Sequence, residues 1–278
     1  MSAHPASAAP VLGRPRPLAD SLTMLRRRLR QMRRHPSLTL LLVGQPIVLL
    51  LLFVTVFGGT MGAGLAGAGG GRAEYLTYIT PAVLLMTIAS VALATAIGVA
   101  TDMTEGIVAR FRTMAVARVS MLAGHVTGAL VQTAFAVVLV LAVAVGLGFR
   151  SDAGPTAWLG VAALLLLMTI ALTWFTVALG LAASSVETAS NTPMFLVLLP
   201  FLGSGFVPTG SMPAGIRWFA EYQPFTPMID ALRGLLGVGP GAGTDLGTDA
   251  ALTVGWCVLI TGASYLWARR LYDTRAER

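Results

Sequence analysis

The sequence predicts an all-α membrane protein with six transmembrane helices, and three observations carry this prediction. Hydrophobic residues make up 55% of the 278 residues, whereas charged residues make up only 11%. A soluble domain carries roughly 25% charged residues. The apolar residues form stretches of about 20, the length that a helix needs to cross the hydrocarbon core of a bilayer. The arginines lie mainly beside these stretches rather than within them, as in a multi-pass membrane protein.

The chain begins with a polar segment, residues 1–17, that we expect to be disordered. Across residues 18–36, leucines and one methionine then recur at spacings of three and four, with arginines between them. A basic helix with a narrow apolar stripe lies in the membrane interface. We therefore predict an interfacial amphipathic helix here, and the alternative is a disordered basic tail. Pro36 then turns the chain into the bilayer.

A transmembrane domain is predicted for residues 37–268, followed by a cytoplasmic tail at 269–278. The fifth of its six spans is short. The predicted spans are residues 38–57, 76–100, 121–147, 157–183, 192–207 and 250–268.

The orientation follows from the arginines, of which the chain has nineteen, with no lysine. Fifteen of them lie in the N-terminal segment, in the loop after the second span and in the tail. Because basic loops stay inside the cell, both termini are predicted to be cytoplasmic, in a multi-pass protein of the cell membrane.

Two segments are expected on the outer side. The glycine-rich residues 58–74, GGTMGAGLAGAGGGRAE, are predicted to be a flexible linker. In residues 208–249, prolines separate short apolar pieces that carry single charges. We expect this stretch to form short helices that dip into the outer leaflet, because irregular backbone at that depth must be covered by protein or water.

No catalytic, cofactor or metal site is predicted in this chain. A P-loop needs a lysine, so the chain is not expected to hydrolyse ATP itself. The single cysteine and the three scattered histidines offer no metal-ligand spacing. Ser204, between two glycines, could be a protease nucleophile, but every histidine is predicted to lie at the cytoplasmic side. The arginines cluster beside apolar spans, so nucleic acid is not an expected partner.

Three carboxylates near span ends, Glu187, Glu221 and Asp230, are candidates for a polar path, since ionisable groups in a membrane are usually functional. Each is nevertheless expected at a span end, where water is available.

The stretch DMTEGIVARFRTMAVAR, residues 102–118, interrupts the apolar spans with a short basic amphipathic helix that Thr104 can cap. Such a helix could lie on lipid, pack under its own bundle or dock on a partner. Phe111, between Arg110 and Arg112, suits a partner pocket, because aromatic residues and arginine are favoured anchors at interfaces.

The same stretch, extended as DMTEGIVARFRTMAVARVSMLAG, resembles the first cytoplasmic loop of type-2 ABC exporter permeases. It is most similar to the daunorubicin-resistance permease group of actinobacteria. The segment GSGFVPTGSMPAGIRWFAEYQPFTPMIDALRGL and the opening GQPIVLLLLF of the first span resemble the same group. The resemblance covers nearly the whole chain, except about the first 20 residues.

The resemblance implies six-helix subunits that pair as a homodimer or a heterodimer, with two copies of a separate ABC ATPase that binds ATP and Mg. The first cytoplasmic loop would be the coupling helix that docks in a groove of this ATPase. The path would run between the second and fifth spans at the dimer interface. The implied docking residues are Glu105, Gly106, Arg110, Phe111 and Arg112. The implied path residues are Asn191, Thr192, Met194 and Phe195.

The expected function is therefore that of a permease subunit that exports hydrophobic small molecules, such as an antibiotic, across the lipid bilayer. One alternative keeps this fold and changes the cargo to a lipid or a glycan precursor. Another is a regulatory or assembly partner in the membrane that transports nothing.

Overall fold

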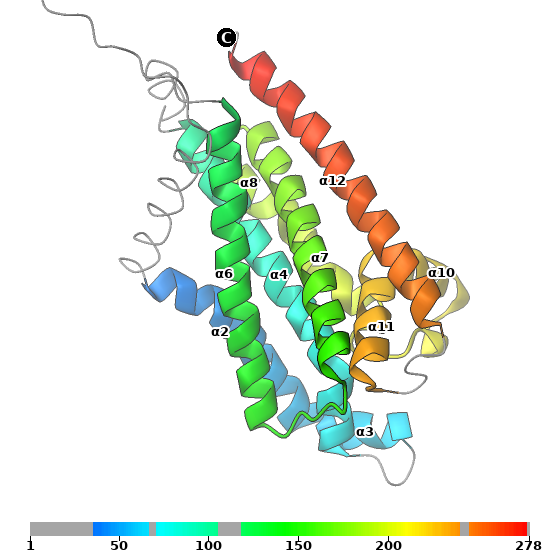
Figure 1. The fold of residues 1–278 in the computed structure, drawn as a ribbon. Coiled ribbons are helices and arrows are strands. Elements are labelled where there is room, and N and C mark those ends of the chain that lie inside the picture. Colours follow the sequence, from blue (N-terminus) through cyan, green and yellow to red (C-terminus); the bar gives the residue numbers. More distant parts are fainter. Residues whose placement is uncertain (1–35, 67–70, 105–117, 240–244, 277–278) are drawn as a thin grey trace, which may run out of the picture.

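The computed structural model describes residues 36–66, 71–104, 118–239 and 245–276, which form a bundle of helices (Figure 1). No strand occurs within these ranges. Three predicted segments lie outside them: the disordered N-terminus, the interfacial helix up to residue 35, and the loop at 105–117 with its five predicted docking residues.

The first span is one continuous helical segment whose geometry changes along its length. Helix α2 (Pro36–Leu52) runs into the π-helical turn η1 (Phe53–Phe57) and then into α3 (Gly58–Ala66). At the bottom of the bundle in Figure 1, α3 turns away from the direction of α2. Residues 58–66 were predicted to be a flexible linker, and this prediction is wrong. They form a helix that packs against α4.

The central helix is α4 (Arg72–Thr104), which contacts α2, α6 (Arg118–Gly146) and α7 (Pro155–Ala182). In its most apolar stretch of 18 residues, 78% is buried inside the bundle, a larger share than in any other long helix among the described residues. Buried threonines in α4 donate to carbonyl oxygens one turn earlier in the same helix, as Thr80 does to Leu76 and Thr87 to Val83. These hydroxyls are therefore satisfied without a partner from another helix.

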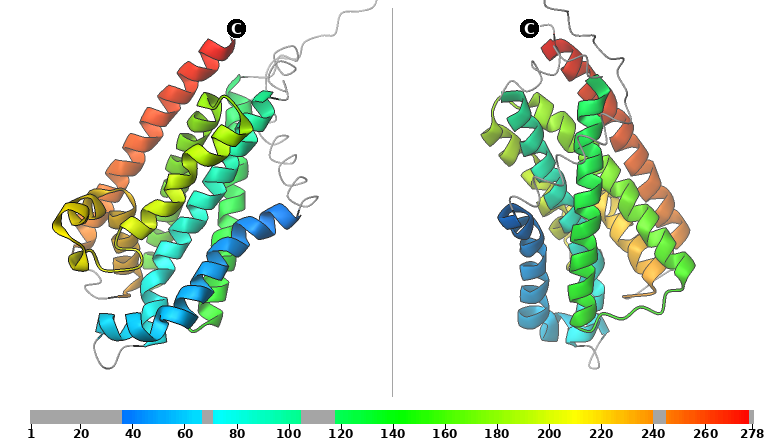
Figure 2. Two further views of the ribbon diagram at one scale, coloured as in Figure 1. Left: turned by 180° about the vertical axis from the view of Figure 1, so that it is seen from behind. Right: turned by 60° about the vertical axis from the view of Figure 1, so that its left-hand side comes forward.

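The last helix, α12 (Leu246–Ala276), packs along α7 and α11 (Phe225–Leu236) on one side of the bundle (Figure 2). In its most apolar stretch of 18 residues, only 17% is buried inside the bundle. Apolar side chains on its other side, such as Val258 and Leu259, are exposed, as expected for a surface in contact with lipid. The helix continues through most of the predicted cytoplasmic tail.

The fifth predicted span is broken into short helical pieces, because Pro193 and Pro200 each remove a main-chain donor. It begins at Val186 rather than at residue 192, because the Ser185 side chain caps the first turn by accepting from the Thr188 N–H. The pieces are α8 (Val186–Asn191), η3 (Thr192–Met194), α9 (Phe195–Leu198) and η4 (Leu199–Leu202).

A tight turn at residues 203–206 follows, and then short helices fold back onto the bundle. These are η5 (Thr209–Ser211), α10 (Ala214–Tyr222) and α11. Gly237, with φ of 66°, ends α11 in the left-handed conformation that glycine adopts without strain.

Five helices among the described residues are long and apolar enough to cross a membrane, and the chain is thus a multi-pass membrane protein. They are Leu42–Leu65, Arg72–Thr104, Leu122–Gly146, Pro155–Ala182 and Leu246–Leu271. Where the fifth of the six spans was predicted, the structure has the shorter apolar segment Val186–Leu202.

Candidate functional site

The four predicted path residues lie together on an exposed face of the fifth segment. Asn191 and Thr192 are exposed, and Met194 and Phe195 are 55% and 44% exposed. Leu198 and Leu202 continue the same face, because residues three or four apart share one side of a helix. We call this exposed surface, formed by Asn191, Thr192, Met194, Phe195, Leu198 and Leu202, the path face.

The path face is mostly apolar, and the segment that carries it packs against the bundle. The Phe195 ring meets the Phe175 ring of α7 edge to face, with 6.2 Å between ring centroids. On the opposite side of the segment, Pro193, Leu196 and Val197 are buried against the bundle. A surface of this kind can contact a hydrophobic molecule, a lipid chain or another protein subunit.

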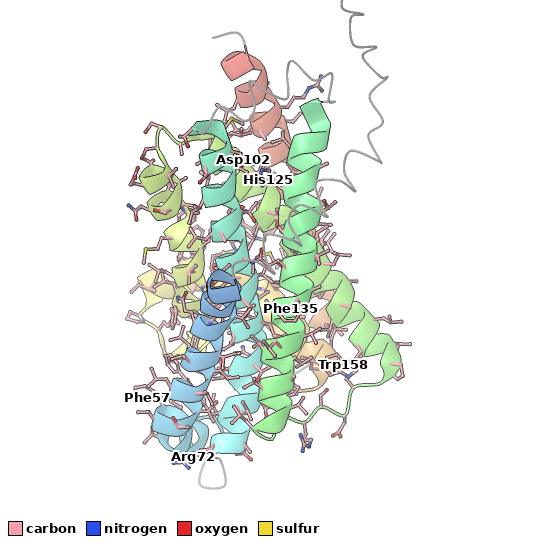
Figure 3. All side chains as sticks on the ribbon, turned by 90° about the vertical axis from the view of Figure 1, so that its left-hand side faces the viewer. Phe57, Arg72, Asp102, His125, Phe135 and Trp158 are labelled. Carbon is pink, nitrogen blue, oxygen red and sulfur yellow. The ribbon has the colours of Figure 1, made fainter. Side chains whose placement is uncertain are left out.

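The predicted docking residues lie outside the described residues, but the structure places the helices on either side of them. Helix α4 ends at Thr104 and α6 begins at Arg118, at the same end of the bundle (Figure 1). Here His125 of α6 and Asp102 of α4 face each other, far from Phe57 and Arg72 at the other end (Figure 3). His125 Nε2 lies 3.0 Å from Asp102 Oδ2. We call this contact and the two helix ends the α4–α6 junction.

At the opposite end, the turn at residues 203–206 fits closely against its neighbours. A Cβ on Gly203 would lie 2.4 Å from both Gln223 Nε2 and Thr226 Oγ1. A Cβ on Gly205 would lie 2.5 Å from the carbonyl oxygen of Pro200. Only glycine fits at these two positions, so the small residues of the GSG sequence serve close packing. We call residues 203–206 the closing turn.

A buried arginine joins the closing turn to two helices. Arg233 of α11 is 5% exposed, and its Nη2 donates to the carbonyl oxygens of Ser204 at 2.8 Å and Gly205 at 3.2 Å. Its Nε and Nη2 also donate to the carbonyl oxygen of Tyr78 in α4, at 3.2 and 3.0 Å. Its Nη1 donates to Asp230 Oδ1 at 2.9 Å. The guanidinium is therefore paired with main-chain dipoles and one carboxylate, as a buried charge must be.

Ser204 belongs to this network and has no histidine beside it. Its hydroxyl donates to Asp230 Oδ1 at 2.9 Å, and its carbonyl oxygen accepts from the Tyr78 hydroxyl at 2.8 Å. The described histidine, His125, pairs with Asp102, which is 24 residues further along α4 than Tyr78. At 1.5 Å per residue that separation is about 36 Å, so Ser204 and His125 cannot form a protease dyad.

Of the three carboxylates considered for a polar path, Asp230 belongs to the Arg233 network, and its side chain is 36% exposed. Asp230 accepts from both Ser204 and Arg233. Glu221 accepts from Arg217 Nε at 2.7 Å on the exposed surface of α10, and Glu187 is exposed in the first turn of α8. No group of three His, Cys, Asp or Glu side chains that could hold a metal ion occurs within the described part of the chain.

Aromatic rings hold the other side of the closing turn against the first span. The rings of Phe201 and Phe206 stack with centroids 4.3 Å apart. Phe53, in the π-helical turn η1, lies 4.7 Å from Phe206 and 6.2 Å from Phe201. The irregular part of the first span thus meets the irregular end of the fifth segment, and π-turns occur often at functional sites.

The comparison with known families decides the identity of this bundle. The family model described as ABC-2 type transporter matches residues 20–236, which include the loop at 105–117, the path face and Arg233. The chain belongs to the ABC-2 type transporter family. The resemblance of the loop and of the segment after the fifth span to type-2 ABC permeases is therefore confirmed.

The chain is also similar to a permease of a drug-resistance transporter. The chain is 28% identical over 221 residues to the daunorubicin resistance ABC transporter permease protein of Streptomyces coeruleorubidus. The aligned region covers 79% of this chain and 75% of the relative. As a member of the ABC-2 type transporter family, the chain is a permease subunit in the membrane.

The sequence did not reveal the Arg233 network as a candidate site. Tyr78, Ser204 and Arg233 lie in three separate segments, and no sequence spacing links them. One signal was present, namely an arginine inside the largely apolar piece 225–236, where an unpaired charge would be costly.

Proposed function

We propose that this chain is the membrane-spanning subunit of an ATP-driven exporter that moves hydrophobic small molecules of the drug class out of the cell. Family membership supports the ABC transporter, and the drug-resistance role of the relative supports the cargo. The observation that carries the cargo class is the path face, which exposes Met194, Phe195, Leu198 and Leu202 beside only two neutral polar side chains. Such a surface binds apolar molecules through burial rather than through specific hydrogen bonds.

The segment Val186–Leu202, extended by the closing turn, is the fifth of six membrane crossings in this proposal. One end packs near Ala100 of α4 through Ala189, and the other end lies against Ala82 at Gly205. The two α4 positions are 18 residues apart, a rise of about 27 Å in an α-helix. That rise is close to the hydrocarbon thickness of about 30 Å. Six crossings put both termini on the cytoplasmic side, in agreement with the arginine distribution.

The working transporter consists of two permease subunits and two copies of a separate ABC ATPase. A second permease copy, identical or different, covers the path face and closes the path from the other side. The chain holds no ATP or Mg of its own and is not an enzyme by itself, because the ATPase subunit binds and hydrolyses the nucleotide. Glu105, Gly106, Arg110, Phe111 and Arg112 dock on that subunit.

Closure of the ATPase pair on ATP pushes the docking loop, and the push reaches the bundle through the two helices that flank this loop. The α4–α6 junction joins these helices, so a displacement of the loop moves α4 relative to the fifth segment. The path face then opens toward the outer side.

A lipid cargo is the second candidate, and the apolar character of the path face supports it as well. A glycan precursor would need more hydrogen-bonding side chains along the path than the two neutral polar ones seen here.

The docking assignment is tested by co-purification of the permease with its ATPase, comparing wild type with Phe111→Asp and Phe111→Leu. We expect the aspartate variant to insert into the membrane but to lose the ATPase, because a charge cannot enter an apolar pocket unpaired. The leucine variant keeps an apolar side chain and should retain the ATPase. Equal retention by all three proteins would refute the docking assignment.

The cargo is tested with the complete transporter in inside-out vesicles and daunorubicin as the probe. ATP-dependent accumulation of daunorubicin is expected, and a fluorescent phospholipid measured in parallel distinguishes the lipid alternative. If the complex hydrolyses ATP and moves neither probe, the proposed cargo class is wrong.

A further inference from the structure

Arg233 is a buried charged residue that takes no part in the transport cycle proposed above. It lies in the last turn of α11, where a cation is favoured by the helix dipole, and it is almost completely excluded from solvent. Burial of an arginine is costly unless its donors are all directed at acceptors. The groups that accept hydrogen bonds from Arg233 therefore indicate its role in the structure.

Two of those partners are main-chain groups that lie outside any regular helix. The carbonyl oxygens of Ser204 and Gly205 belong to the closing turn, where no helical ladder satisfies them. The third acceptor, the carbonyl oxygen of Tyr78, lies three residues before Pro81. Because Pro81 lacks a main-chain N–H, the carbonyl of Thr77 loses its helical donor, and the helical ladder of α4 is disturbed directly beside Tyr78.

The aromatic ring of Tyr78 completes the arrangement. The guanidinium carbon of Arg233 lies 3.6 Å from the centroid of this ring, within the range of a cation–π contact. The hydroxyl of the same tyrosine donates to the Ser204 carbonyl oxygen. Arg233 and Tyr78 thus hold the closing turn from two directions, and a planar guanidinium with five donors suits this task better than a lysine ammonium.

The position of the closing turn explains why a fixed geometry matters. Leu202 is the last exposed residue of the path face, and the four residues of the turn that follows it are all buried. The path face therefore ends where the turn folds under α4 and α11. If the turn moved away from Tyr78, the path face would continue to the end of the bundle.

We propose that Arg233 is a positioning residue that holds the closing turn against α4 and so keeps the outer end of the path shut in the resting transporter. This inference rests on the proposed function, because it takes the path face as the route of the cargo. Arg233 does not contact the cargo, and it acts through the turn that it fixes.

The test is the leak of a small dye through the resting transporter. Complete transporter, permease with its ATPase and without ATP, is reconstituted in vesicles that contain carboxyfluorescein. Arg233→Ala is compared with Arg217→Ala, which removes an arginine from the exposed surface of the neighbouring helix α10. We expect dye release several-fold faster from Arg233→Ala vesicles and at the wild-type rate from Arg217→Ala vesicles.

The variant Arg233→Lys separates geometry from charge. A lysine can pair with Asp230 but cannot reach all the carbonyl acceptors at once, so this variant should also release dye faster than wild type. Normal insertion of Arg233→Ala with a wild-type rate of release overturns the proposal, and so does equally fast release from Arg217→Ala.

If Arg233→Ala does not insert, Tyr78→Phe provides a milder test. This change removes the hydroxyl bond to Ser204 and keeps the ring under the guanidinium, and we expect about twofold faster release together with faster hydrogen exchange in residues 203–206. Unchanged exchange and release in Tyr78→Phe and Arg233→Lys would overturn the proposal. Daunorubicin transport by the wild type is measured separately, so failure of the proposed cargo is distinguished from failure of the closing role.

Discussion

The two ends of this bundle are held in different ways. At one end, the closing turn is fixed by the hydrogen bonds of Arg233, Tyr78 and Thr226 and by the stacked ring of Phe206. At the other end, a side-chain hydrogen bond joins His125 of α6 to Asp102 of α4, and beside it Val99 of α4 packs with Leu122 and Val126 of α6 in an apolar cluster. Many directional contacts define a single arrangement, whereas apolar packing has no preferred direction and lets neighbouring helices shift at lower cost. The hydrogen bonds thus fix the first end more tightly than the second, which suits the closing and coupling roles proposed above.

The largest loss is expected where the aromatic rings hold the closing turn. Phe206→Ala removes a buried ring that contacts Phe201 and Phe53, so it should lower the free energy of unfolding by about 3 kcal/mol, as large-to-small changes in packed cores do. Unfolding is measured in mixed detergent micelles. Phe57→Ala is the matched control, because the Phe57 side chain is 41% exposed and its loss leaves little empty space. Equal losses in the two variants would contradict the idea that the turn is the rigid part.

A smaller loss is expected from an added methyl group nearer the α4–α6 junction. A Cβ on Gly180 of α7 would lie 2.6 Å from the main-chain oxygen of Ala96 in α4. Gly180→Ala should therefore lower the free energy of unfolding by about 2 kcal/mol, the usual cost of overpacking. In Gly255→Ala of α12 the new Cβ meets nothing within 4 Å, and the higher helix propensity of alanine should leave stability equal or slightly raised. A loss in Gly255→Ala as large as in Gly180→Ala would show that the close approach of α4 and α7 does not set the cost.

The sequence alone predicts the long helices and the irregular segments with different success. The long apolar runs identify α4, α6, α7 and α12, because crossing a bilayer imposes a length and a composition that can be counted. The glycine-rich residues 58–66 were misjudged, since the tertiary packing of α3 on α4 overrides the low helix propensity of glycine. The start of the fifth segment moved to Val186 because a local serine cap extends it.

The sequence predicts one part of the candidate site and misses another. The path residues were predicted from the resemblance to known permeases, and the structure places all four on one exposed face. The Arg233 network was not predicted, because most of its acceptors are main-chain carbonyls of α4 and of a glycine turn, which lie far apart in the sequence. Main-chain acceptors leave no mark in a sequence, so only the fold brings them together.

The smallest effect on stability is expected for a change at the α4–α6 junction. The same change should reduce transport clearly. His125→Ala removes one buried hydrogen bond, with a cost of about 1 kcal/mol. If the junction carries movement from the docking loop into the bundle, this variant should still hydrolyse ATP but move several-fold less daunorubicin per ATP. His125→Gln keeps a side-chain donor that can reach Asp102 and should recover part of the transport.

Thr127→Val is the control on the same helix, because the Thr127 hydroxyl donates to Ala123 of its own helix. It should leave the ratio of transport to hydrolysis unchanged. If the ratio falls equally in Thr127→Val and His125→Ala, the change reflects a general disturbance of α6, and the contact with Asp102 has no special part in coupling. If the ratio falls in His125→Ala alone, a single weak bond at the α4–α6 junction controls transport while contributing little to stability. The closing turn would then differ from the α4–α6 junction, since its contacts contribute both to the stability of the fold and to closure of the path.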